Sequence, residues 1–482
     1  MARAWACALL LAPALAVAHA FVQPYSLPVP LSLYAAGSAL ALGISFVGIA
    51  LFASTPALLE VPQRPDHDLA SLLPRSVVFI GRTVALALLW LSITAGFIGT
   101  PNPYVNVNMT LFWIIFVLGV PYLSAVVGDI YSAVNPWRTL VVLLQAASGV
   151  SFDRRRCPSI GYAAGISLYI AFIWLELFGN LSPSGLSKAL LAYTLVNIAG
   201  AYWWGKEEWF EKSEFFGVMN SIVGSMAPMT LEPSGTGAGA GTGTRLRWRA
   251  PFVGVLQRQK AGAGLTLFIL FMLSSTAYDG LHSTSPWVNA FWKHIYPHLE
   301  PLSVLVSLKK YELSTHLYYV WQWSSMALSP LAYLLIFTVF MGIAKSLTGS
   351  ALSISELVSR FAVTIVPIAL AYHITHYYTL FLMQAGQIAR LISDPFGAGW
   401  NIFGTANLRV GAIMVSADTI WHSQVVIILV GHIASVYLAH VEALRVFGSR
   451  RTAVRSQVPL LVLMVLFTVL GLWILSLPLV TA

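Results

Sequence analysis

Long apolar runs separated by short polar segments make up most of the chain. Runs of about 20 apolar residues are long enough to cross the hydrocarbon core of a bilayer as α-helices. The alternating short strands of an outer-membrane barrel do not occur in this sequence. The pattern predicts ten membrane-spanning helices, at residues 31–53, 77–99, 109–131, 160–178, 186–204, 262–278, 318–343, 358–382, 419–444 and 458–479. We therefore expect an all-α polytopic membrane protein, with one helical transmembrane domain over residues 21–482.

Composition supports this interpretation, since 57% of the residues are hydrophobic and only 9% are charged. Soluble domains carry about 25% charged residues, so the lipid bilayer is the expected surrounding. The net charge of +9 is interpreted as an orientation signal, and no nucleic-acid partner is expected.

The first 20 residues, MARAWACALLLAPALAVAHA, have the features of a signal peptide. A short positive region with Arg3 is followed by an apolar stretch and two overlapping A-x-A cleavage sites. Cleavage after Ala18 would leave His19 at the mature N-terminus, where its amine and imidazole are able to chelate copper. The alternative, that His19 only flanks the cleavage site, stays open.

Arginine and lysine gather in every second loop, which predicts a bacterial cytoplasmic (inner) membrane protein with its mature N-terminus and its C-terminus on the outer side. In this topology residues 205–261 form a long cytoplasmic loop with a Gly/Thr-rich linker. Residues 279–317 form an outer loop rich in aromatic residues and histidine.

The stretch AYHITHYY places His373 and His376 one helical turn apart inside an apolar run. Ionisable residues inside a bilayer are costly and are therefore functional candidates. His422 and His432, in the next predicted span, lie about 80° apart around their helix. We interpret these four histidines as candidate ligands of a divalent transition metal, zinc or copper. The competing interpretation is that each histidine only bonds a neighbouring carbonyl.

Asp279 and His282, in STAYDGLH, are the candidate catalytic residues, as a base or as groups that support the metal ligands. Asp129 is expected to pair with Arg138 across a helix break at Pro136. The pattern assigns no role to Glu176, late in the fourth predicted span. Cys7 and Cys157 predict no disulfide framework.

Several segments carry a family likeness that runs over most of the chain: GDIYSAVNPWR, NLSPSGLSKALLAYTLVN, TAYDG, AYHITHY, LISDPFGAGWNIFGTA and GHIASVYLAH. With them the chain resembles the integral-membrane proteins known as fenitrothion hydrolases. The resemblance implies a membrane-bound hydrolase that cleaves phosphotriesters of the organophosphate type to a nitrophenol and a dialkyl thiophosphate. A histidine-bound metal would supply the hydroxide for this reaction, and a small apolar substrate would reach the site through the bilayer.

Two other functions stay open at this point. The first is a transporter or copper-handling membrane protein without hydrolase activity. The second is a membrane subunit whose histidines are structural and whose partner subunit carries the activity.

Overall fold

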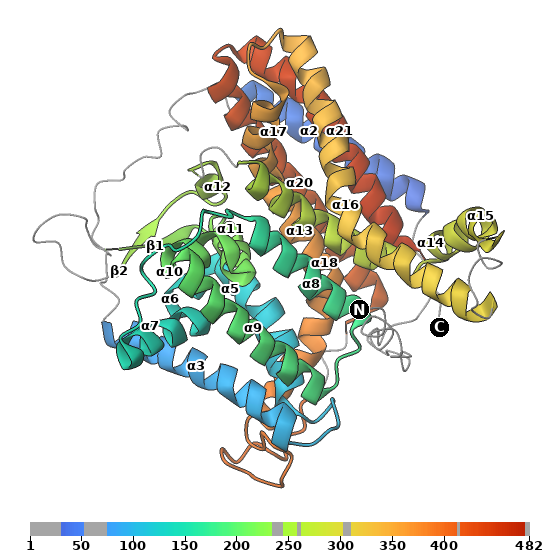
Figure 1. Cartoon of the computed structure of the whole chain (residues 1–482). Helices are drawn as coiled ribbons and strands as arrows, with labels where there is room; N and C mark the ends of the chain where they lie inside the picture. Colours follow the sequence, from blue (N-terminus) through green and yellow to red (C-terminus); the bar gives the residue numbers. More distant parts are fainter. Residues whose placement is uncertain are drawn as a thin grey trace, which may run out of the picture.

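The computed structural model describes residues 30–52, 75–233, 244–257, 262–301, 310–411 and 415–477. These residues are nearly all helical (Figure 1), as the sequence predicts. The exception is a hairpin in which β1 (Met229–Pro233) pairs antiparallel with β2 (Thr244–Trp248). The predicted signal peptide, with His19, and most of the Gly/Thr linker lie outside the described residues.

Eight helical segments within the described ranges are long and apolar enough to cross a membrane. Six of them are single helices: α2 (Leu31–Phe52), α3 (Arg75–Ile98), α13 (Ala263–His282), α16 (Lys310–Thr348), α20 (Ala417–Phe447) and α21 (Arg450–Ser476). The seventh runs continuously through α4 (Val107–Met109), η3 (Thr110–Gly119) and α5 (Val120–Val127). The eighth runs continuously through α17 (Ile354–Ala362), η7 (Val363–Ile365), α18 (Val366–Gln384), η8 (Ala385–Gln387) and α19 (Ile388–Leu391).

The predicted count of ten spans is therefore not confirmed, although the chain has the helices of a multi-pass membrane protein. The two remaining predicted spans correspond to α8 (Ala163–Phe178) and α9 (Pro183–Trp204). α8 has 16 residues, which is short for the hydrocarbon core. α9 has 22 residues, but Lys188 and several serine, threonine and asparagine residues make it less apolar.

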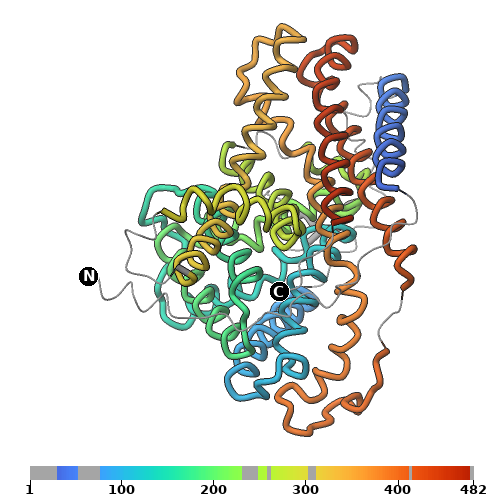
Figure 2. Tube along the Cα trace, turned by 90° about the vertical axis from the view of Figure 1, so that its right-hand side faces the viewer, coloured from blue at the N-terminus to red at the C-terminus, as the bar shows by residue number. Residues whose placement is uncertain are grey.

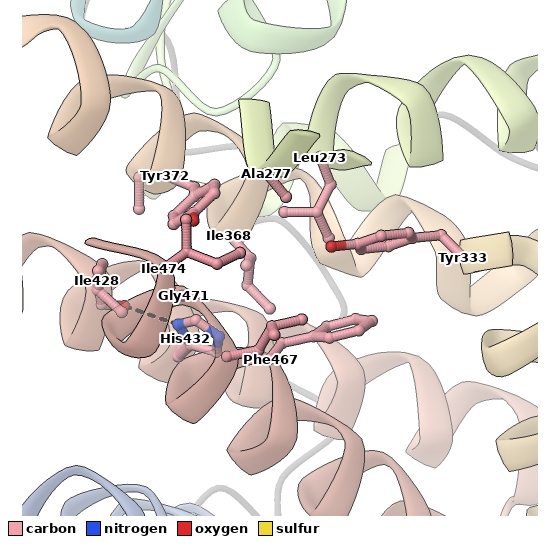
Figure 3. A pocket seen from close by; sticks show the side chains of 12 residues that line it. Leu273, Ala277, Tyr333, Ile368, Tyr372, Ile428, His432, Phe467, Gly471 and Ile474 are labelled. Atoms are coloured by element: carbon pink, nitrogen blue, oxygen red, sulfur yellow. Dashed lines mark hydrogen bonds between the residues drawn. The ribbon is translucent and has the colours of Figure 1, made fainter. Parts of the chain in front are cut away.

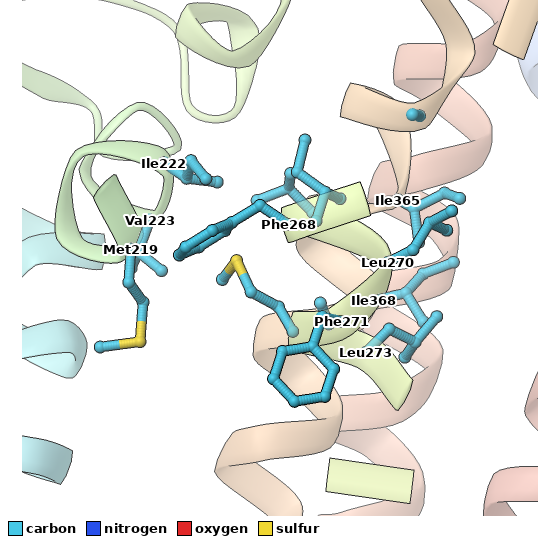
Figure 4. Packing of buried hydrophobic residues seen from close by; sticks show 14 of the residues in the cluster. Met219, Ile222, Val223, Phe268, Leu270, Phe271, Leu273, Ile365 and Ile368 are labelled. Atoms are coloured by element: carbon cyan, nitrogen blue, oxygen red, sulfur yellow. The ribbon is translucent and has the colours of Figure 1, made fainter. Parts of the chain in front are cut away.

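Two groups of helices meet at α13, which is largely buried (Figure 1). On one side α13 packs against α16, α18 and α21, and on the other side against α8. The N-terminal α2 packs against α20 and α21, near the other end of the chain (Figure 2). Figure 4 shows apolar side chains of α13, among them Phe268 and Phe271, between Met219 of α11 (Phe215–Gly224) and Ile368 of α18. Any side chain near the end of α13 is therefore placed between the two groups.

Residues 206–224 differ from the expected cytoplasmic loop. They form α10 (Lys206–Glu208), η4 (Trp209–Ser213) and α11, which fold back onto α5, α8 and α9. Trp209 is buried, and its indole N–H donates to Asn197 Oδ1 at 2.8 Å. The segment packs inside the domain because its aromatic residues bury a large apolar area.

Glu214 joins three helices of the group that lies on the α8 side of α13. Its carboxylate is fully buried and caps the N-terminus of α11, where it accepts a bond from Gly217 N at 2.8 Å. It also accepts bonds from Tyr193 Oη of α9 at 2.5 Å and from Asn135 Nδ2 at 3.0 Å. Asn135 in turn caps α7 (Pro136–Ser148). The starts of two short helices are thus fixed to the middle of α9.

The expected ion pair between Asp129 and Arg138 is wrong. Asp129 instead caps α6 (Ile130–Val134) by accepting bonds from the backbone and the hydroxyl of Ser132. Arg138 pairs with Glu207 of α10. The free N–H groups at the start of α6 lie next to Asp129 and bind it locally, whereas α7 carries Arg138 away toward α10.

Candidate functional site

Asp279 on the last turn of α13 meets α18 through a short ion pair and a hydrogen bond. His376 Nε2 lies 2.7 Å from Asp279 Oδ2. The Tyr377 hydroxyl donates to the same oxygen at 2.6 Å. Asp279 is only 4% exposed, so its charge is stabilised by these groups rather than by water. Two residues that are nearly 100 positions apart in sequence therefore form one acid–base pair.

A cavity opens beside this pair, between α8, α13, α18, η3 and α11. Part of its wall is apolar, with Val117, Phe172 and Ile173. Its polar lining residues are Tyr169, Glu176, Ser275, Thr276, Asp279, His373 and Tyr377. None of the residues that line it is Lys or Arg. Two carboxyl groups and no fixed positive charge in the wall favour a cation over an anion.

Glu176, which the sequence pattern left without a role, belongs to this site. It reaches the cavity from α8, interacts with the Tyr377 hydroxyl and is within electrostatic range of Asp279. Tyr377 therefore lies between two carboxyl groups. The sequence signal was present, since a single glutamate in an apolar run is costly without a partner.

His373 lines the same cavity one turn before His376. Its ring packs against the rings of Tyr377 and Tyr122, with centroids 4.9 and 5.8 Å apart. Its Nδ1 is buried and has no hydrogen-bond partner among the residues described. This nitrogen is able to take a proton or bind a ligand in the cavity.

His282 lies beside the pair on α13. Its Nδ1 is 2.8 Å from the backbone oxygen of Asp279 and 3.9 Å from the Asp279 carboxylate. Its ring stacks on Tyr278, with the centroids 5.6 Å apart. The structure thus brings together the two residues that the sequence suggested as catalytic.

His422 and His432 do not join His373 and His376. His422 Nδ1 bonds to the Asp418 carbonyl oxygen at 2.7 Å, and its other nitrogen lies 3.3 Å from Tyr34 Oη of α2. His432 Nδ1 bonds to the Ile428 carbonyl oxygen at 2.9 Å, in a separate apolar pocket. Ten residues of helix also separate the two by about 15 Å along the axis.

The predicted four-histidine metal site is therefore not assembled. The described ranges contain no group of three or more His, Cys, Asp or Glu side chains arranged to hold a metal ion. α20 does pack against α18, but His432 shares a pocket with Tyr372 of α18, and His422 lies next to Tyr34 of α2. These four residues, as placed in the described part of the chain, do not fit a shared metal.

No family model, curated protein or solved structure matches the chain. The resemblance to fenitrothion hydrolases therefore stays a prediction from the sequence.

Proposed function

We propose that this multi-pass membrane protein exchanges a small cation for protons at the site formed by Asp279 and Glu176, as a proton-coupled carrier does. The observation that supports this most is the buried Asp279 carboxylate, which is bonded to His376 and to Tyr377. Tyr377 also interacts with Glu176. Buried carboxyl and imidazole groups in membrane domains form proton relays and cation pathways.

The charge balance of the site explains the exchange. A cation that enters the cavity is stabilised when both carboxyl groups are ionised. Its arrival therefore favours the loss of a proton from Glu176 or from the His376–Asp279 pair. The site also lies where the two helix groups meet, so a shift of one group against the other would alter access to it.

Proton release on cation binding tests this function. We expect purified protein in weakly buffered detergent to release about one proton per chain when Zn²⁺, Cu⁺ or Na⁺ is added, followed with a pH-sensitive dye. Glu176→Gln should lose most of this release, because the variant keeps the shape of the side chain but cannot ionise. Glu356→Gln is the matched control, since Glu356 lies on α17 in an ion pair with Arg360. Equal release from wild type and Glu176→Gln would contradict the proposal.

The second candidate is the hydrolysis of an apolar phosphotriester. It is favoured by the apolar part of the cavity wall, where Val117, Phe172 and Ile173 lie beside Asp279. In this reaction Asp279, oriented by His376, would accept a proton from the attacking water. The carrier is the better-supported function because hydrolysis develops negative charge on the phosphoryl oxygen, and no Lys or Arg lines the cavity to stabilise that charge.

We further infer that the protein lies in a bacterial inner membrane with both mature ends on the outer side. The support is the distribution of arginine and lysine, with Lys345 and Arg445 among the residues of the predicted inner loops. In a Cys157→Ala background, a cysteine introduced at Ala351, between α16 and α17, should react with an impermeant thiol reagent only from the cytoplasmic side. Reaction only from the outer side would reverse this orientation.

A further inference from the structure

A second pocket lies apart from the Asp279 cavity and shares no lining residue with it. It is enclosed by α13, α16, α18, α20 and α21 (Figure 3). Its wall is mostly hydrocarbon and includes Leu273, Ile368 and Phe467. Three polar side chains, Tyr333, Tyr372 and His432, interrupt this wall. Tyr372 and His432 are the two that have buried polar atoms without a hydrogen-bond partner in the described part of the chain.

These two side chains carry complementary polar atoms. His432 Nδ1 lies 2.9 Å from the Ile428 carbonyl oxygen, which only accepts, so the neutral ring has its proton on Nδ1 and a lone pair on Nε2. His432 Nε2 and the Tyr372 hydroxyl are both buried and have no hydrogen-bond partner within the described part of the chain. The residues are 3% and 6% exposed. A buried polar group without a partner destabilises the protein, so a ligand that satisfies both groups binds more tightly.

The partner that fits is a group that donates one hydrogen bond and accepts another. A hydroxyl does this by donating to His432 Nε2 and accepting from the Tyr372 hydroxyl. The pocket has a volume of about 20 Å³, which admits one hydroxyl-sized group. Water is one source of such a group, but buried water typically makes about three hydrogen bonds, and two groups without a partner line this pocket.

Access to the pocket favours a source in the bilayer. Leu470 of α21 lines the pocket and is 37% exposed on the outer surface of an apolar helix. We propose that the pocket binds the hydroxyl group of an apolar alcohol dissolved in the membrane, whose hydrocarbon chain passes Leu470 into the lipid. This site is independent of the proposed cation exchange.

Photolabelling of the full-length protein in lipid nanodiscs tests the proposal. The probe is octanol with a diazirine on its chain, and labelled peptides are identified by mass spectrometry. We expect labelling of α20 and α21, reduced by unlabelled octanol but not by octane. Tyr372→Phe and His432→Phe should each weaken it about tenfold, the effect of one lost hydrogen bond.

Two further variants separate binding from folding. Leu470→Trp, at the exposed edge of the pocket, should block labelling while the buried groups stay unchanged. His422→Phe, on the same helix as His432, should leave labelling at the wild-type level. Labelling that persists in Tyr372→Phe and His432→Phe, or that octane reduces as strongly as octanol, would overturn the proposal. Absence of hydroxyl-dependent labelling in the wild type would leave water as the occupant and would overturn it as well.

Discussion

Replacing Asp279 by asparagine is expected to abolish cation-driven proton release. The asparagine amide keeps the size of the side chain and can still accept a bond from Tyr377. It cannot ionise, and His376 loses the charge that its Nε2 faces at 2.7 Å. Without that charge a buried imidazole is favoured in its neutral form. The Asp279 carboxylate and the charged form of His376 are therefore lost together. The dye assay measures the resulting loss of proton release directly.

Asp279→Ala should in addition destabilise the fold by about 3–5 kcal/mol, since removing one partner of a buried pair leaves the other uncompensated. Thermal unfolding in detergent measures this loss. Asp279→Asn should unfold closer to the wild type, so that its defect in proton release is not a defect in folding. Full release from a folded Asp279→Asn protein would exclude the proposed site.

The same variant separates the two candidate functions. If purified wild type releases a nitrophenol from a fenitrothion-type triester and Asp279→Asn does not, the hydrolase is the correct function. If neither protein shows turnover while proton release depends on Asp279, the carrier is correct.

The stability of the fold should fall as pH rises, through Glu214. Burial raises the pKa of this carboxyl from the ordinary 4.5 to about 7, although bonds from Tyr193, Gly217 and Asn135 partly oppose the rise. Between these two pH values the folded protein holds a proton that the unfolded chain has lost. Stability is therefore greatest below about pH 4.5, falls up to about pH 7 and then levels off. The total change is on the order of 3 kcal/mol.

Glu214→Gln should remove this pH dependence, because glutamine resembles the protonated acid at all pH values. The variant should also be more stable than the wild type above pH 7, where ionised Glu214 is least favourable. Unfolding midpoints between pH 4.5 and pH 8 measure both effects. Glu356→Gln again serves as the control, and a wild-type pH profile in Glu214→Gln would show that another group is responsible.

The sequence by itself determined that this is a helical membrane protein. The length and hydrophobicity of a helix are set by residues that are neighbours in the sequence. For this reason α2, α3 and α20 start and end close to their predicted positions. The sequence also identified His373 and His376 as candidates, because an ionisable residue in an apolar run is costly wherever that run packs, and it named Asp279 at the end of the sixth predicted span.

Only the tertiary structure decided which of these residues act together. Asp279 meets His376 because α13 packs against α18, and Glu176 joins them because α8 covers the other side of α13. His422 faces Tyr34, and His432 has its own pocket. Local periodicity gives the angle of a side chain around its helix, but the identity of the facing helix depends on how complementary surfaces pack between distant segments. That packing keeps His422 and His432 apart from His373 and His376, and it places Glu176 beside Asp279.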